Sequence, residues 1–288
     1  MNIKSDLQRA RFIHGASSCK FATTGPIISA VHWYSAARLR RATYVIAGDG
    51  LPELAKLFWL GTMNDPLCWL CGTVADSAEH MVKASDFRAL FPGVDQRNPV
   101  FRHTKDRSNL PIKGANAAAL KFSPSLCQFC NNARTQPHDL AWALLSSTLQ
   151  STFLVPGARL PITRAFGSSA RESMLHVHLY FLKLFGCYAV EHKIPLPTRD
   201  FAVAICSNLP HPNVHLGFVA VASNAARNDI FVGNIEAINR GNRTVSAVWF
   251  YILGAVGVHI AYWEPGHPRL HNYRGWNPSD VSLNIRLR

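Results

Sequence analysis

Acidic residues are scarce in this chain of 288 residues, which has 17 Asp and Glu against 30 Lys and Arg. The formal net charge is +13. A positive surplus of this size favours a polyanionic partner such as nucleic acid. The surplus is uneven, because residues 1–62 carry +5, residues 63–149 carry +2 and residues 150–288 carry +6. If nucleic acid binds, the two flanking segments supply much of the attraction for phosphate.

A secretory signal is also missing, since no N-terminal stretch has a charged segment followed by an apolar one. The seven cysteines do not form a disulfide framework, because the chain is long and Cys19, Cys187 and Cys206 are scattered among apolar residues. We therefore expect a reducing compartment, the cytoplasm, in which paired thiols bind metal.

Long hydrophobic runs are rare, and the one that stands out covers residues 247–263. It is slightly short for a membrane-spanning helix, contains glycines and a histidine, and is rich in aromatic and β-branched residues. This composition favours two buried strands that meet near Gly254 and Gly257. We therefore expect no membrane partner.

Composition divides the chain into three segments. Residues 1–62 are basic, with Asp6 as the only acid before Asp49. This composition is typical of a transit peptide, of sequence upstream of a true start at Met63, or of a basic arm that binds nucleic acid. We expect a poorly specified N-terminal extension there. Residues 63–149 form a motif-bearing module, and residues 150–288 form an accessory α+β domain of unknown role.

Two Cys-x-x-Cys pairs dominate the middle segment, Cys68–Cys71 and Cys127–Cys130. Two residues between paired cysteines let both thiolates reach one ion from a tight turn, and two such pairs complete a tetrahedral site. Gly72 and Asn131, which follow the pairs, are typical of these turns. The sequence therefore predicts a structural Zn²⁺ site.

Further polar residues lie beside both pairs. Glu79-His80 follows the first pair, and the second pair runs directly into Asn131-Asn132-x-Arg134. With the cysteines, this pattern resembles the HNH endonuclease family over roughly residues 66–142.

The resemblance implies a zinc-stapled HNH module of the ββα-metal type. It implies that His80 is the general base, that Glu79 binds a divalent metal or orients its water, and that Asn131 ligates that metal. Mg²⁺ or Mn²⁺ would be the catalytic ion. The substrate would be nucleic acid, with DNA as the first choice. This chemistry suits a neutral imidazole near pH 7 and a hard cation that neutralises charge on the phosphate.

Basic residues near the motif and in the tail are candidates for contacts with nucleic acid. They are Lys83, Arg134, which faces a phosphate or pairs with an acid, and Arg274, which lies in a tail of alternating basic and aromatic residues. A surface edge strand is the other interpretation of that tail. His138 and Asp139 either begin a helix or reach the cleft of Asn131.

The sequence departs from the family at the middle Asn. Residues 121–124, before the second cysteine pair, contain no asparagine, and Asn116 lies further upstream. A non-catalytic zinc-binding nucleic-acid adaptor is therefore the alternative function. A third possibility places the main function in residues 150–288.

The fold class is α+β, with the HNH module followed by a domain that contains an antiparallel sheet. The patterns predict a helix over 85–91 with Ser85 as its N-cap, a loop over 94–116, and a longer helix opened by Pro137. In the last segment they predict an amphipathic helix over 170–193, a shorter helix from Thr198, and strands over 214–222, 229–238, 244–253 and 255–263.

Overall fold

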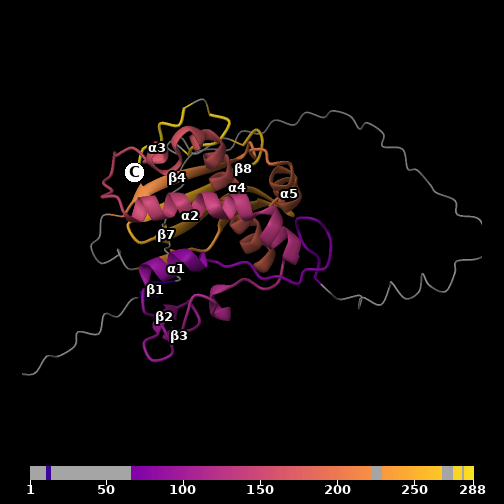
Figure 1. Ribbon diagram of the computed structural model, residues 1–288. Helices are drawn as coiled ribbons and strands as arrows, with labels where there is room; N and C mark the ends of the chain where they lie inside the picture. The colour runs from indigo at the N-terminus through magenta and orange to yellow at the C-terminus, as the bar shows by residue number, and fades with distance from the viewer. Residues whose placement is uncertain (1–10, 14–65, 222–228, 268–274, 281) are drawn as a thin grey trace, which may run out of the picture. The chain divides into compact units, whose positions relative to one another are not determined.

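The computed structural model describes residues 11–13, 66–221, 229–267, 275–280 and 282–288. Met63, Arg274 and almost all of the predicted extension 1–62 therefore lie outside the described residues. Within the described part, a mixed assembly of helices and a largely antiparallel sheet gives the α+β class that the sequence predicts (Figure 1). No helix in this part is long and apolar enough to cross a membrane.

The sheet has the strand order β3-β2-β1-β5-β7-β8-β4, and β6 also pairs with β7. Its strands are β1 (Arg11–Ile13), β2 (Val100–His103), β3 (Leu110–Ile112), β4 (Val214–Ala220), β5 (Ile230–Val232), β6 (Glu236–Arg240), β7 (Arg243–Leu253) and β8 (Val256–Trp263). The short strand β1 pairs in parallel with β2 and β5, and the other pairings are antiparallel.

The apolar run 247–263 forms most of the hairpin of β7 and β8, as predicted. The chain reverses at Gly254, whose φ of +56° lies in the left-handed region that favours glycine. The predicted strand 229–238 is instead two strands, β5 and β6, that both pair with β7. The described residues of the C-terminal tail run beside β4, where Trp276 forms a bridge with Leu216.

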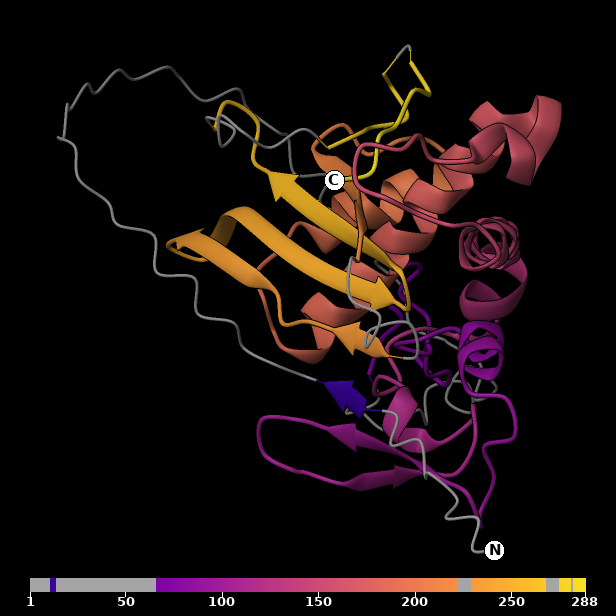
Figure 2. The same cartoon turned by 90° about the vertical axis from the view of Figure 1, so that its left-hand side faces the viewer.

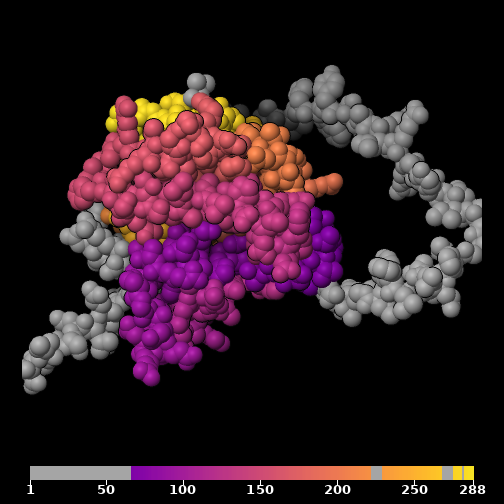
Figure 3. Space-filling model, viewed as in Figure 1, coloured from indigo at the N-terminus to yellow at the C-terminus, as the bar shows by residue number. Residues whose placement is uncertain are grey.

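Two helices, α2 (Gln136–Gln150) and α4 (Ala170–Glu191), lie across one face of the sheet (Figures 1 and 2). The ring of Trp142 on α2 stacks on Tyr180 of α4 at 5.7 Å and meets Tyr251 of β7 edge-on at 6.0 Å. These aromatic contacts join the predicted metal module to the segment predicted as an accessory domain. Figure 3 shows the surfaces of the two segments in direct contact on the visible face.

Helix α4 confirms the predicted helix, but the prediction that this helix is amphipathic is wrong. Every residue from 177 to 189 is buried. This stretch is buried on all sides, because α4 is covered by the sheet, by α2 and by α5 (Thr198–Ser207). The remaining helices are short, namely α1 (Ala84–Leu90), α3 (Ile162–Phe166) and the 3-10 turns Ala118–Leu120 and Gly167–Ser169.

The motif segment differs from the expectation in two details. Helix α1 begins one residue early, with Lys83 rather than Ser85 at its N-cap and no side-chain capping bond. The stretch predicted as a loop contains the hairpin of β2 and β3, in which Val100 pairs with Ile112. Both of these residues are buried, which stabilises the hairpin despite the charged residues between them.

Candidate metal centre and adjoining pocket

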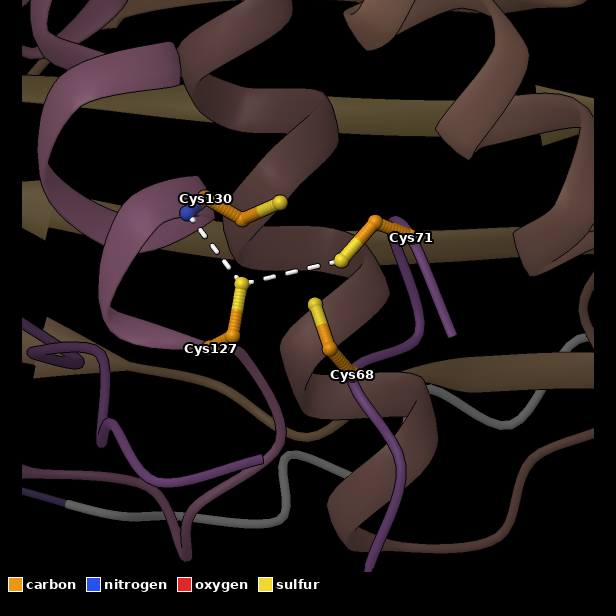
Figure 4. Close-up of side chains that lie close together, drawn as sticks. All are labelled: Cys68, Cys71, Cys127 and Cys130. Carbon is orange, nitrogen blue, oxygen red and sulfur yellow. Dashed lines mark hydrogen bonds between the residues drawn. The ribbon is translucent and has the colours of Figure 1, made fainter. Parts of the chain in front are cut away.

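The four paired cysteines converge as the sequence predicts. Their Sγ atoms all lie within 4.8 Å of one another, and those of Cys71 and Cys127 are 3.6 Å apart (Figure 4). A disulfide would need about 2 Å, whereas a tetrahedral ion with Zn–S bonds of about 2.3 Å needs sulfurs roughly 3.8 Å apart. The four thiols could therefore hold a metal ion such as zinc.

Backbone hydrogen bonds build the first turn. The N–H of Cys68 donates to Thr73 O at 2.6 Å, and the N–H of Gly72 donates to Cys68 O at 2.7 Å. Gly72 has φ +78°, which explains why a glycine follows Cys71. The tight turn places both thiols of the pair on one side.

The second turn leads into a helix. The N–H of Cys130 donates to Cys127 Sγ at 3.4 Å, and the N–H of Asn131 donates to Cys127 O at 2.9 Å. Residues Cys130–Arg134 then form a π-helical turn before α2 begins. π-Helical turns are often found at functional sites.

The thiols of the cluster differ in their surroundings. A hydrogen bond with Thr73 lowers the pKa of Cys71 to about 6, whereas burial raises the pKa of Cys130. The exposed Cys71 is therefore the thiol that deprotonates most readily. The metal ligand is the thiolate, so a lowered pKa favours metal binding by this thiol.

A pocket of about 320 Å³ adjoins this cluster, and it gathers the polar residues of the motif. Its lining includes Glu79, His80 and Asn131, the three residues that the sequence singles out for chemistry. His80 reaches it from a short strand segment, where it forms an antiparallel bridge with Lys121. Asn131 reaches it from the π-helical turn.

Two polar atoms beside this pocket lack a hydrogen-bond partner among the described residues. They are Nε2 of His80 and Oδ1 of Asn131, and both atoms are buried. The Nδ2 group of Asn131 donates to Ser77 Oγ at 2.9 Å, which fixes the orientation of the amide. An orphaned acceptor of this kind needs a ligand, an ion or a water.

The surroundings of His80 favour the neutral form of its imidazole. Burial lowers its pKa, and the positive charges of Lys121 and Lys83 lower it further. A neutral ring has one nitrogen free to accept a proton. His80 can therefore act as a base at neutral pH.

Two lining residues, Glu79 and Asp139, contact a residue that the sequence did not identify, Lys183 of α4, which itself does not line the pocket. Its fully buried ammonium lies 2.8 Å from Glu79 Oε2 and 2.9 Å from Asp139 Oδ1. Burial lowers the pKa of Lys183, but the two carboxylates outweigh that effect and raise it above its ordinary value. Burial in turn raises the pKa of Glu79, and Lys183 acts against that rise.

One signal in the sequence could have indicated Lys183. It is the only charged residue in the apolar run of residues 177–189, and a lysine there needs a buried acidic partner. The identity of that partner was not predictable, because Glu79 lies 104 positions away.

The remaining candidates fall into different places. Asp139 and Lys83 line the pocket, together with Arg88. Arg134 does not line it, since its Nη1 donates to Cys206 Sγ at 3.0 Å and its guanidinium lies over the Phe129 ring. His138 pairs with His176 instead, with 3.0 Å between their Nδ1 atoms, and Asn116 lies on the surface outside the pocket lining.

Among the described residues, the four cysteines are the one group of three or more His, Cys, Asp or Glu side chains that converges closely enough to hold a metal. A second ion at the pocket would thus depend on Asn131, a carboxylate and waters. No family model, no curated protein and no solved structure matches the chain.

Proposed function

We propose that the protein is a metal-dependent endonuclease of the HNH type that hydrolyses phosphodiester bonds of DNA. The observation that carries the proposal is the meeting of Glu79, His80 and Asn131 in one pocket beside four convergent cysteines. The local topology also supports it. The segment around His80 pairs with the segment before Cys127, and a helix follows, which is a strand–strand–helix order.

The cysteine cluster is proposed to hold a structural Zn²⁺. Four thiolates at tetrahedral spacing suit zinc, and they leave no open position for a substrate. An iron–sulfur cluster also uses four cysteines, so metal analysis of the purified protein distinguishes the two. In either case the cluster fixes the distance between the His80 segment and the Asn131 turn, because each cysteine pair lies next to one of them.

The pocket residues suit a divalent ion such as Mg²⁺ or Mn²⁺. The free Oδ1 of Asn131 is a hard oxygen ligand, and the Glu79 carboxylate lies in the same lining. When bound, such an ion would neutralise negative charge that develops on the phosphate. Mg²⁺ keeps several waters in its shell, so two protein ligands are enough.

His80 is proposed as the general base. Its free Nε2 accepts a proton from the attacking water. The backbone N–H of His80 donates to Glu79 Oε1 at 3.1 Å, and this hydrogen bond fixes the backbone at His80. Lys83 and Arg88 on the pocket lining attract the phosphodiester. The backbone bridge between His80 and Lys121 holds the histidine segment in place without the middle Asn.

The decisive experiment uses supercoiled plasmid and single-stranded DNA, each with Mg²⁺, Mn²⁺ or a chelator. We expect metal-dependent nicking by the wild type and a loss of at least about 100-fold in His80→Ala, the usual worth of a general base. His192→Ala is the matched control, because His192 is exposed at the end of α4 and lies outside the pocket. Equal nicking by His80→Ala and His192→Ala would contradict the mechanism.

The second candidate function is a non-catalytic zinc-binding nucleic-acid adaptor. Two observations favour it, namely the absence of an asparagine in residues 121–124 and the ion pair that already engages Glu79. This candidate predicts salt-dependent DNA binding with no cleavage under any metal condition. The same plasmid experiment, combined with a binding measurement, separates the two functions.

A further inference from the structure

The ammonium of Lys183 has a complete set of acceptors. Besides Glu79 Oε2 and the two oxygens of Asp139, at 2.9 and 3.1 Å, it donates to Thr135 Oγ1 at 3.2 Å. An ammonium has three protons, and three residues accept them. The buried charge is therefore fully satisfied, which is the condition for a lysine in a core.

The three acceptors belong to the three segments that carry the pocket. Glu79 precedes His80 on its strand segment, and Asp139 lies in the first turn of α2. Thr135 ends the π-helical turn. Its hydroxyl, which accepts from Lys183, donates to Cys130 O at 3.0 Å or to Asn131 O at 3.1 Å. One side chain of α4 thus contacts the residue that precedes His80, the first turn of α2, and the hydroxyl that bonds to the second cysteine turn.

Stability alone does not explain this arrangement. A buried ion pair contributes little net stability, because desolvation of the charges offsets their attraction. Its better-attested role is to fix one geometry among several. Packed apolar residues at these positions would stabilise the core without any polar contact.

We propose that Lys183 is the positioning residue of the pocket, holding Glu79, Asp139 and the Asn131 turn in register for hydrolysis. The inference rests on the proposed function and extends it to the segment 150–288. Lys183 itself is fully buried and does not line the pocket. Its role is therefore indirect, through the residues that it holds.

The test compares Lys183→Met with Leu184→Ala. Leu184 is a fully buried neighbour on α4 that makes none of these polar contacts, so its variant reports a general loss of core stability. For Lys183→Met we expect a fall in kcat of about 100-fold with little change in KM, the usual effect of a displaced catalytic group. Folded Leu184→Ala should keep the wild-type kcat.

A milder variant, Thr135→Val, guards against misfolding of Lys183→Met. It removes the hydroxyl that accepts from Lys183 Nζ and donates towards the Asn131 turn. We expect a fall in kcat of about 10-fold, the usual effect of a lost hydrogen bond. The proposal is overturned if either of these variants has the kcat of the wild type. The proposal is equally overturned if the fall in kcat of these variants is fully explained by the fraction of protein that is unfolded, as is expected of Leu184→Ala.

A readout besides activity separates this proposal from the proposed function. The ring ¹⁵N and ¹H signals of His80, assigned with His80→Gln, should shift in Lys183→Met and stay in place in Leu184→Ala. If the wild type cleaves no DNA but the His80 signals shift, the nuclease function fails and the positioning role stands. Unchanged signals in Lys183→Met overturn the positioning role whatever the activity.

Discussion

Cysteine thiols in the described part of the chain have three different surroundings. Cys127 belongs to the convergent cluster, whereas Cys187 is fully buried in α4, where burial raises the pKa of its thiol to about 12. Cys206 is exposed and accepts a hydrogen bond from Arg134. Among the described cysteines, only the cluster brings four thiols close enough together to surround one ion, so only the cluster is suited to zinc.

Cys127→Ser should therefore lower the zinc content, because a hydroxyl is a poor replacement for a thiolate. We expect less than one zinc per chain by elemental analysis and a thermal midpoint lower by on the order of 10 °C, since metal binding contributes directly to folding. Cys206→Ser, the same substitution outside the cluster, should retain both values. Full zinc occupancy in Cys127→Ser would contradict a four-cysteine site.

At the scale of elements, α4 supports both the cysteine cluster and the pocket. Lys183 serves the pocket, and Gly186, nearly one turn further on, faces the indole of Trp69 between the first two cysteines. A Cβ at Gly186 would lie 2.5 Å from Trp69 Cη2 and 2.6 Å from Cζ2. The missing side chain is what lets the first cysteine turn pack against this helix.

Gly186→Ala should destabilise the protein by about 1–2 kcal/mol, because the cost of overpacking exceeds the gain in helix propensity. Urea unfolding measures the change. Trp69→Phe shortens the ring, so the double variant should recover part of the loss relative to Trp69→Phe alone. A more stable Gly186→Ala protein would show that the indole does not occupy this position.

At the scale of the whole molecule, several histidines are buried in neutral form. Burial lowers the pKa of His178 to about 3 and the pKa values of His211 and His259 to about 4. The nearby His211 and His215 lower the pKa of His178 further. His178 also accepts the backbone N–H of His211 at 3.2 Å. These rings favour the folded state only while they are neutral.

The fold should thus lose stability in mild acid. The folded pKa values lie below the ordinary value near 6.5, so the unfolded chain takes up more protons as the pH falls from about 6.5 towards 4. Each ring costs up to about 1.4 kcal/mol per pH unit in that window. Burial raises the pKa of Asp86 to about 6, so this one carboxyl group opposes the loss of stability as the pH falls.

Thermal unfolding at pH 7 and pH 5 measures this dependence. His178→Gln keeps an acceptor for the His211 N–H. It should flatten the decrease by roughly a quarter, because His178 is one of four described rings, with His138, His211 and His259, whose pKa burial lowers to about 3 or 4. His192→Gln, at an exposed position, should leave the decrease unchanged. A thermal midpoint that is higher at pH 5 than at pH 7 would contradict the burial of neutral histidines.

Local patterns were sufficient for much of the fold. The hairpin of β7 and β8 followed from an unbroken apolar run with a glycine at its turn, and α4 followed from helical spacing. The hairpin of β2 and β3 was missed because its strands are short and carry charged residues. The N-cap of α1 was missed because no side chain caps this helix, so the preference for serine at that position did not apply.

The sequence by itself determined the cysteine cluster, since each pair is a short local turn and two such pairs can meet around one ion. It also indicated Glu79, His80 and Asn131, because they lie within ten residues of those turns. Only the tertiary structure decided that Lys183 and Asp139 join them. The physical reason is that a buried lysine is stable only where acceptors from distant segments meet, and the chain order of 79, 139 and 183 does not reveal that meeting.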